Sequence, residues 1–286
     1  MKVCLIAVCH GSYEEALLFL DSIEASLIGS EIELDIYFVE NSSKFDDEMI
    51  LQIKRRCMNS FFHYVASENI GYFPSAAAAI KENNIISTDY DYFIISNVDL
   101  IISKSFFPTL KNIPFCKNIG VYAPAILSKK TNIDKNPKIT ERPTAYKLRL
   151  NLFLFRRAQT YTLLVLFNYL RVKLTKFIKF ILKQARTTQQ IKNSNIYAPH
   201  GSFILMTKEF FRNNLTLDYP MFLFGEEIYI AERARSSNLE ITYTPSLVIY
   251  DSEHASTSLL NNKNYRSLNI NSLAYLLKTY QWNSHE

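Results

Sequence analysis

Glycine is scarce in this sequence: only six of its 286 residues are Gly. No G-x-G-x-x-G segment occurs, which excludes the dinucleotide-binding fingerprint, and the Gly-rich phosphate loop that ends in Lys-Ser or Lys-Thr is absent as well. The four cysteines, Cys4, Cys9, Cys57 and Cys116, lack the C-x-x-C spacing of metal sites, so we expect reduced thiols without a role.

Long hydrophobic runs are also missing. No uncharged apolar stretch approaches the ~20 residues of a membrane-spanning helix, and the first residues lead directly into a strand-like segment. We therefore expect neither a signal peptide nor a membrane span. With 48% hydrophobic and 21% charged residues, the composition is that of an ordinary globular protein with a sizeable core.

Acidic residues are absent from one part of the chain. Ten Lys or Arg and no Asp or Glu lie between Lys147 and Arg186, whereas the rest of the chain holds 22 basic and 27 acidic residues. The net charge of +5 therefore arises from this segment alone.

The first third of the chain alternates apolar runs with amphipathic stretches. The runs predict strands at Val3–Val8, Leu34–Val39, Phe61–Ala66 and Tyr92–Ser96, separated by helices at about Tyr13–Leu27, Lys44–Met58 and Ser75–Asn83. Ser12 is the expected N-cap of the first helix, with Glu15 completing a capping box. Strands separated by helices predict a parallel, doubly wound α/β sheet.

Three of these strands end in polar residues. The clusters are His10-Gly11-Ser12, Glu40-Asn41-Ser42-Ser43 and Asn97-Val98-Asp99. Because parallel strands present their carboxyl ends at one edge of the sheet, we expect all three in one crevice, with a nucleotide as occupant. A carboxylate such as Asp99 is a typical ligand of a hard divalent cation that it shares with a diphosphate. The simpler alternative is an Asp that merely ends a strand.

Five segments in order carry a resemblance to a known family. They are Val39-Glu40-Asn41-Ser42-Ser43, Glu68-Asn69-Ile70-Gly71-Tyr72, Ser96-Asn97-Val98-Asp99, Gly201-Ser202-Phe203, and the stretch from Phe222-Leu223-Phe224-Gly225-Glu226-Glu227 through Arg233 to His254. Together they resemble glycosyltransferase family 2, in particular its rhamnosyltransferase-like branch. The resemblance implies a GT-A fold: an α/β protein with a Rossmann-like mixed, mainly parallel sheet flanked by helices. It also implies a nucleotide-sugar donor, a divalent cation (Mn²⁺ or Mg²⁺) and inversion at the anomeric carbon.

The resemblance also implies roles for individual residues in the first half. Glu40 stands where the family has an Asp that contacts the nucleoside, and Asn69 and Gly71 match its Asn-x-Gly turn beside the donor. Asn97-Val98-Asp99 matches the Asn-Pro-Asp form of its metal motif, with Asp99 as the metal ligand. His10, Asn41 and Asn97 complete the expected donor site.

Two acids at the start of a predicted helix form the second polar centre. Glu226 and Glu227 open a helix that reaches about Ser237, and a helix N-terminus stabilises carboxylates. The second acid resembles the family's general base, so Glu227 inherits that role while Glu226 holds the loop. Without the resemblance, the pair would be an ordinary helix-dipole device. Arg233 is expected to support the acidic loop, and His254 to be a further ligand of the metal or the diphosphate.

The segment from about Ser128 to Asn195 is an insertion that the family core does not require. Helical character extends from Ala145 to Gln184, and apolar residues from Leu170 onward recur at helical spacing between Lys173, Lys176, Lys179 and Lys183. This pattern predicts a basic amphipathic helix on an anionic membrane surface. The alternative is a helical hairpin that packs on the catalytic domain or forms a homodimer. Nucleic acid is disfavoured because it would leave the dense apolar residues exposed.

The sequence thus predicts four regions: residues 1–127 for nucleotide-sugar binding, the insertion 128–195, an acceptor and catalytic half at 196–258, and a C-terminal helix in 259–286. Whether that helix packs on the sheet or on the insertion is left open. The predicted function is an inverting, metal-dependent hexosyltransferase that acts on a glycan or lipid-linked acceptor in surface polysaccharide synthesis. Its donor would be a uridine or thymidine diphosphate sugar, and its location cytoplasmic, peripheral at the inner face of the cell membrane. The alternatives are a sugar nucleotidyltransferase and a non-catalytic, membrane-associated module that binds nucleotide sugars.

Overall fold

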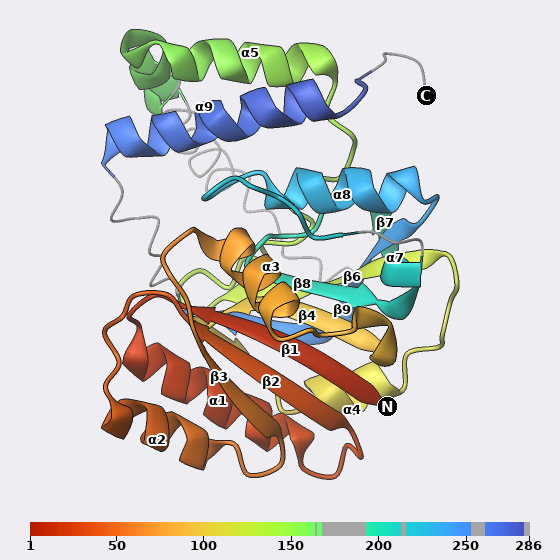
Figure 1. The fold of residues 1–286 in the computed structure, drawn as a ribbon. Helices are drawn as coiled ribbons and strands as arrows, with labels where there is room; N and C mark the ends of the chain where they lie inside the picture. Colours follow the sequence, from red (N-terminus) through yellow and green to blue (C-terminus); the bar gives the residue numbers. More distant parts are fainter. Residues whose placement is uncertain (164, 168–192, 213–215, 253–260, 283–286) are drawn as a thin grey trace, which may run out of the picture. The chain divides into compact units, whose positions relative to one another are not determined.

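The computed structural model describes residues 1–163, 165–167, 193–212, 216–252 and 261–282 (Figure 1). These residues form two compact units. The first consists of the described parts of Met1–Arg142 and Asn193–Leu259, and the second of the described parts of Pro143–Lys192 and Leu260–Glu286.

One nine-stranded sheet forms the centre of the first unit within the described residues. Its order is β3-β2-β1-β4-β8-β6-β9-β5, with β7 paired to β9. The strands are β1 (Lys2–Cys9), β2 (Glu33–Glu40), β3 (Phe61–Ala66), β4 (Tyr92–Asn97), β5 (Leu100–Ile102), β6 (Ile119–Ser128), β7 (Ser194–Ile196), β8 (Phe203–Thr207) and β9 (Glu240–Asp251). The first four are mutually parallel, and β6 is parallel to β9, whereas β5, β7 and β8 run antiparallel to their neighbours. The predicted mixed, mainly parallel sheet is therefore confirmed.

Helices cover both faces of this sheet (Figure 1). One face carries α1 (Tyr13–Leu27), α2 (Asp47–Arg56) and α4 (Phe106–Lys111), and the other carries α3 (Tyr72–Glu82), α7 (Lys208–Arg212) and α8 (Glu226–Ser236). A short 3-10 helix, η1, spans Ser87–Asp89. The central strands β1 and β4 are almost completely buried between the two layers, which explains why they read as unbroken apolar runs.

The predicted elements of the first third are confirmed to within a few residues. The capping box at Ser12 is wrong: Ser12 occupies the N-cap position but its side chain makes no capping hydrogen bond. Its φ of −95° and ψ of 72° lie outside the extended conformation from which an N-cap side chain reaches the first turn. Asp46, at φ −88° and ψ 173°, does cap α2 by accepting from the Met49 N–H.

The helix α8 and the strand β9 are joined by a short turn. Asn238 follows α8 with φ +55°, a left-handed conformation that Asn adopts more readily than most residues. The strand β9 then runs from Glu240 to Asp251, and its pairing with β6 shifts register between Pro124 and Ala125.

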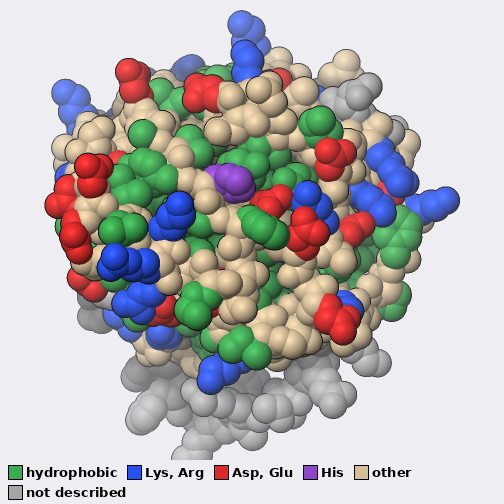
Figure 2. All heavy atoms as spheres, turned by 60° about the horizontal axis from the view of Figure 1, so that its bottom comes forward, with side chains coloured by type: hydrophobic (Ala, Val, Ile, Leu, Met, Phe, Trp, Pro, Cys, Tyr) green, Lys and Arg blue, Asp and Glu red, His purple; other side chains and the backbone are tan. Residues whose placement is uncertain are grey.

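The face turned toward the viewer in Figure 2 carries Lys and Arg side chains interspersed with Asp and Glu. Hydrophobic side chains appear there as small separate areas between the charged ones. This mixture is typical of a solvated protein surface and lacks the single-sign field of a nucleic-acid-binding face.

The second unit contains α5 (Ala145–Arg156) and α9 (Asn262–Thr279), which pack on one another. The Arg266 guanidinium donates to the carbonyl oxygens of Phe155 and Arg156, each at 2.9 Å. The C-terminal helix therefore joins the insertion, which the sequence had left open.

Two further predictions concern residues that the structure does not describe. The basic amphipathic stretch from Leu170 to Lys183, in the insertion, and the proposed ligand His254 both lie outside the described residues. Within the described residues, no helix is long and apolar enough to cross a bilayer.

Candidate active site

The carboxyl ends of β1, β2 and β4 lie side by side in the sheet. Cys9 pairs with Glu40 in the ladder of β1 and β2, and Val8 pairs with Asn97 in the ladder of β1 and β4. The polar residues that follow these strands therefore emerge along one edge, as the sequence predicts.

A chain of hydrogen bonds joins two of the strand ends to α3. His10 Nδ1 donates to Asn41 Oδ1 at 3.0 Å, and Asn41 Nδ2 donates to Ser75 Oγ at 3.3 Å. Asn41 is buried, whereas His10 is exposed. The contacts fix the Asn41 amide and place the His10 ring at the rim of the site.

Glu40 is buried and its carboxylate is engaged by the turn that follows it. Oε1 accepts from the backbone N–H of Ser42 at 2.7 Å and from the Ser42 hydroxyl, and Oε2 accepts from the N–H of Ser43 at 3.1 Å. In the described structure, Glu40 thus holds the 41–43 turn in shape.

The Asn69–Gly71 turn lies against the loop that leads into α8. Gly71 has φ +108°, and the Tyr72 N–H donates to the Phe222 carbonyl at 3.3 Å. Asn69 is exposed in this turn. Two segments about 150 residues apart in the sequence are therefore joined through their backbones beside the strand ends.

The acid pair begins α8 directly after Gly225, which has φ +88°. The loop before it is fixed because the Tyr219 hydroxyl donates to the Phe224 carbonyl at 2.7 Å. Glu226 packs on Gly201: a Cβ at position 201 would stand 2.5 Å from Glu226 Oε1. Glu227 Oε1 lies 4.0 Å from Lys138 Nζ. The segment that the sequence singled out at 201–203 thus supports the acid pair.

The two acids differ in their electrostatic environment. Burial, together with the neighbouring Glu227 carboxylate, raises the pKa of Glu226 to about 8. Glu226 therefore retains its proton near neutral pH. The Glu227 side chain keeps 16% exposure and has the Lys138 ammonium beside it.

Asp99 lies in the bend between β4 and β5. Its Oδ1 is buried and has no hydrogen-bond partner among the described residues. Burial and the neighbouring Asp251 raise the pKa of Asp99 above its ordinary value. A buried carboxylate oxygen without a partner is costly unless a ligand or an ion completes it.

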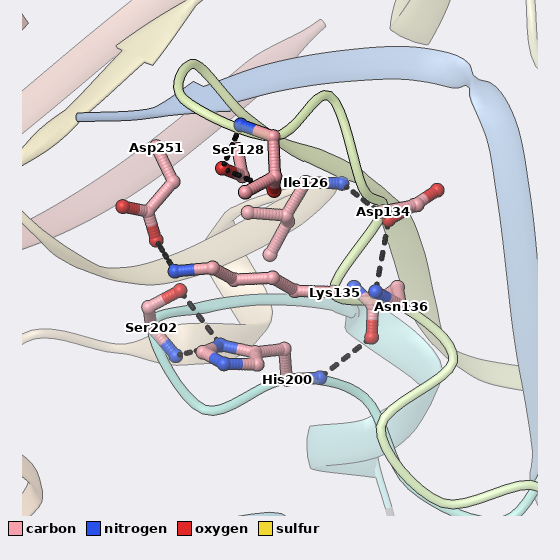
Figure 3. A network of polar contacts seen from close by, with 9 residues as sticks. Ile126, Ser128, Asp134, Lys135, Asn136, His200, Ser202 and Asp251 are labelled. Atoms are coloured by element: carbon pink, nitrogen blue, oxygen red, sulfur yellow. Dashed lines mark hydrogen bonds and ion pairs between the residues drawn. The ribbon is translucent and has the colours of Figure 1, made fainter. Parts of the chain in front are cut away.

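Asp251 brings a second carboxylate to the same place. It ends β9 and pairs with Leu100 in β5, while the Ser252 N–H donates to the Asp99 carbonyl at 3.4 Å. Asp251 is buried, and its Oδ2 accepts from Lys135 Nζ at 2.6 Å (Figure 3). The two acids are therefore adjacent, and one of them is paired with a lysine.

His200 adds a neutral imidazole to this cluster (Figure 3). Its Nδ1 accepts from the Ser202 N–H at 3.2 Å and lies 2.9 Å from Ser202 Oγ, so the ring proton belongs on Nε2. Burial, with Lys138 and Lys135 nearby, lowers the pKa of His200 to about 3. The Ser202 carbonyl accepts from the Asn97 N–H at 2.9 Å, which connects this loop to the end of β4.

Tyr72 connects the two acidic centres. Its hydroxyl is buried and lacks a partner among the described residues. Burial raises the pKa of Tyr72 well above its ordinary value, with further contributions from Glu226, Asp99 and Glu227. Acidic groups of both centres therefore contribute to the electrostatic environment of this hydroxyl.

The sequence analysis assigned no role to several of these residues, namely Tyr72, Lys135, Lys138, His200 and Asp251. Asp251 carries the same signal as Asp99, since it is an acid that ends an apolar strand. Arg233 Nη2 donates to Thr216 Oγ1 at 3.4 Å, in the segment that leads to the acid pair, and its expected support of the acidic loop stays a prediction.

The donor set fits a divalent cation that is shared with a substrate. Asp99 supplies one buried, unpartnered oxygen, which is the type of ligand that Mg²⁺ and Mn²⁺ take beside substrate phosphates. Among the described residues no group of three or more His, Cys, Asp or Glu is arranged to hold a metal alone. A cation at this place would therefore depend on oxygen ligands from the substrate and from water.

No protein-family model and no curated protein matches this sequence. Solved structures do match. TarS 1-349 of S. aureus matches over 88% of this chain and 60% of its own, at 11% identity and TM-score 0.54. The same protein in complex with UDP-GlcNAc matches over 91% of this chain and 62% of its own, again at 11% identity and TM-score 0.54. The mannosyltransferase PcManGT from Pyrobaculum calidifontis, in complex with GDP-Man and Mn²⁺, matches over 90% of this chain and 59% of its own. The identity is 10% and the TM-score 0.50.

This chain has the GT-A fold. At such low identities the likeness to these glycosyltransferases concerns the fold alone. The GT-A domain described here spans about three fifths of the length of these proteins.

Proposed function

We propose that this GT-A protein is an inverting glycosyltransferase that moves a hexose from a nucleoside diphosphate sugar to a glycan or lipid-linked acceptor. One juxtaposition carries the proposal: the loop at Gly201–Ser202 bonds to Asn97, two residues before the unpartnered buried oxygen of Asp99, and packs on Glu226 of the acid pair. Displacement at an anomeric carbon requires a charge-stabilised leaving diphosphate on one side and a base on the other.

The donor occupies the edge formed by the strand ends. Glu40 acts by fixing the turn after β2, while His10 and Asn41 contribute the polar rim on the nucleoside side. Asn69, Gly71 and Asn97 border the same edge. The complexes of structurally similar proteins with UDP-GlcNAc and GDP-Man support a nucleotide-sugar donor. A uridine or thymidine base is the proposed nucleoside.

Asp99 would hold a Mn²⁺ or Mg²⁺ ion together with the donor diphosphate, and His254 is the proposed further ligand. When bound, the ion neutralises the charge that develops on the departing diphosphate. The Mn²⁺ in the PcManGT complex supports a divalent cation in a protein of this fold.

Glu227 is the proposed base that takes the proton from the acceptor hydroxyl. Glu226 is the less suitable of the two because it retains its proton near pH 7, and a protonated acid cannot accept another. Glu226 instead holds the loop by packing on Gly201. A positioned base contributes about 10²–10⁴-fold to the rate.

An anionic membrane is the proposed location of the acceptor, at the inner face of the cell membrane. Tyr146, Leu150 and Phe153 recur on one side of α5 and are 75%, 40% and 49% exposed. Lys147, Arg149, Arg156 and Arg157 accompany them, and basic residues contribute about 1 kcal/mol each at an anionic leaflet.

Binding of nucleotide sugars to the purified chain tests the donor class. We expect one nucleoside diphosphate sugar of a panel to bind with Mn²⁺, and Asp99→Ala to lose the metal-dependent part of this affinity while its circular dichroism is unchanged. Unaltered donor affinity of Asp99→Ala in Mn²⁺ would remove Asp99 from the site.

A further inference from the structure

The loop after β6 brings a lysine to the two acids of the candidate site. Lys135 Nζ donates to Asp251 Oδ2 at 2.6 Å. The next residue, Ser252, donates its N–H to the Asp99 carbonyl, so Asp251 lies beside the Asp99 backbone. The Lys135 side chain extends from the loop to Asp251 in Figure 3. A positive charge of the protein itself therefore lies beside Asp99, the proposed ligand of the cation and the diphosphate.

The position of Lys135 is fixed on both sides. Its own N–H donates to the Ile126 carbonyl at 2.9 Å. Asp134 Oδ1 accepts from the N–H groups of Ile126 and Asn136, each at 2.9 Å, and Asp134 Oδ2 accepts from the Tyr243 hydroxyl at 2.6 Å. Asn136 in turn donates to the Pro124 carbonyl at 2.8 Å. Little backbone entropy remains to be lost when Lys135 binds a ligand.

The ammonium also has capacity for a ligand. An ammonium has three donors, and the contact with Asp251 is the one side-chain hydrogen bond of Lys135 among the described residues. Its side chain is 29% exposed, whereas that of Asp251 is 8% exposed. The lysine thus neutralises a buried acid while its own side chain stays partly accessible to solvent.

Asp251 is less suited than Asp99 to bind a metal ion because its carboxylate is paired with Lys135. A cation at Asp251 would have to displace the lysine or lie beside its charge, whereas Asp99 Oδ1 has no partner in the described structure. The Asp99 carboxylate is therefore available to a metal ion, whereas the Asp251 carboxylate is already paired with the Lys135 ammonium.

We propose that Lys135 binds the diphosphate of the nucleotide donor, so that the chain retains part of its diphosphate affinity when no divalent cation is present. The inference rests on the proposed function and adds a residue to its donor site. Charge-assisted hydrogen bonds between an ammonium and phosphate oxygens are among the stronger polar contacts.

Titration calorimetry of the full chain with uridine, thymidine and guanosine diphosphates, in EDTA and in Mn²⁺, tests this. In EDTA we expect Lys135→Met to weaken binding of the preferred diphosphate by about tenfold or more, the usual weight of a hydrogen bond to a charged group. Lys129→Met is the matched control, since Lys129 lies on the same loop with an exposed side chain. Its affinity should equal that of the wild type.

A double variant separates phosphate binding from mere neutralisation of Asp251. Lys135→Met leaves a buried carboxylate without its cation and could perturb the fold, whereas Lys135→Met with Asp251→Asn removes both charges together. If the lysine binds phosphate, the double variant remains weak in EDTA. If the lysine only neutralises Asp251, the double variant recovers wild-type affinity and the inference is overturned.

The wild type distinguishes this inference from the proposed function. Binding of a diphosphate in Mn²⁺ together with no binding in EDTA would overturn the role of Lys135 and leave the proposed function standing. No binding of any diphosphate in either condition would overturn both.

Discussion

Gly71 and Phe222 lie in backbone contact across the candidate site. A Cβ at position 71 would overlap the Phe222 carbonyl carbon and oxygen, closer than the 3.0 Å that real Cβ atoms keep. Gly71 also has φ +108°, a conformation that residues with a side chain rarely adopt. The contact joins the Asn-x-Gly turn to the loop that carries the acid pair.

Replacement of Gly71 by Ala should therefore be severe. We expect Gly71→Ala to lower the free energy of unfolding by about 3 kcal/mol or more, because strain at positive φ adds to the overlap with Phe222. Gly29→Ala is the matched control: Gly29 has φ +72° but no atom within 4 Å of a Cβ, so the cost should be about 1 kcal/mol. Equal costs in chemical denaturation would show that the contact is not tight.

The Glu226 carboxyl should make stability depend on pH. Its pKa is raised from 4.5 to about 8 in the folded protein, so between these values the folded state binds more protons than the unfolded state. The free energy of unfolding should therefore fall as the pH rises through this range. The free energy of unfolding of Glu226→Gln should not fall in this way, because the Gln side chain does not titrate. Between pH 5.5 and 7.5 the difference in free energy of unfolding between Glu226→Gln and the wild type should therefore change by about 2 kcal/mol in favour of the variant.

Denaturant titration of both proteins at the two pH values measures this difference. Glu14→Gln is the control, since Glu14 is an exposed acid in the first turn of α1. Its stability should follow the wild type at both pH values. Parallel behaviour of Glu226→Gln and the wild type would contradict a protonated Glu226.

The two acids of α8 should separate in kinetics. Glu227→Gln should bind the donor as the wild type does but lose transfer by about 10²–10⁴-fold, since it cannot accept the acceptor proton. Glu226→Gln resembles the protonated acid in shape and hydrogen bonding, so we expect it to keep most of its activity. The reverse result, with Glu226→Gln inactive and Glu227→Gln active, would exchange the two roles.

The exposed side of α5 should bind anionic vesicles. The triple variant Tyr146→Ser, Leu150→Ser and Phe153→Ser removes apolar area worth about 3 kcal/mol, so vesicle affinity should fall by about a hundredfold in a sedimentation assay. Met58→Ser with Phe61→Ser removes exposed apolar side chains of the first unit instead and should bind as the wild type does. If the triple variant matches the wild type, α5 does not contact the membrane.

Charge should contribute to the same binding. Wild-type affinity for anionic vesicles should decrease steeply with salt, because attraction to the leaflet decays within a Debye length of about 8 Å at physiological ionic strength. A protein that ignores such vesicles at low salt, but dimerises through residues 145–185, would replace the membrane by a protein interface.

The strands that the sequence predicts well are those whose signal is local. β1, β2, β3 and β4 are apolar runs bounded by turns, and their parallel pairing explains why His10, Asn41 and Asn97 emerge along one edge. The Lys135–Asp251 pair was not predictable in this way, because 116 residues separate its members and only the register of β6, β9 and β5 brings them together.

The acid pair was placed correctly at a helix start, but its electrostatics depends on tertiary packing. Nothing local in the sequence reveals that Glu226 lies on Gly201 or that His200 is buried with its Nδ1 occupied by Ser202. Such pKa shifts arise from burial and from charges on other elements, so they follow from the fold rather than from spacing along the chain.

Turnover of a nucleotide sugar tests the central claim most directly. Purified chain, Mn²⁺ and a panel of nucleoside diphosphate sugars are incubated with and without a glycan acceptor, and release of free nucleoside diphosphate is followed. We expect release of nucleoside diphosphate from one donor class, stimulated by an acceptor and abolished in Asp99→Ala. A chain that binds the donor but never releases the diphosphate would be a binding module. A chain that instead joins a sugar phosphate to a nucleoside triphosphate, with release of pyrophosphate, would be a nucleotidyltransferase. Either result would contradict the proposed glycosyltransferase activity.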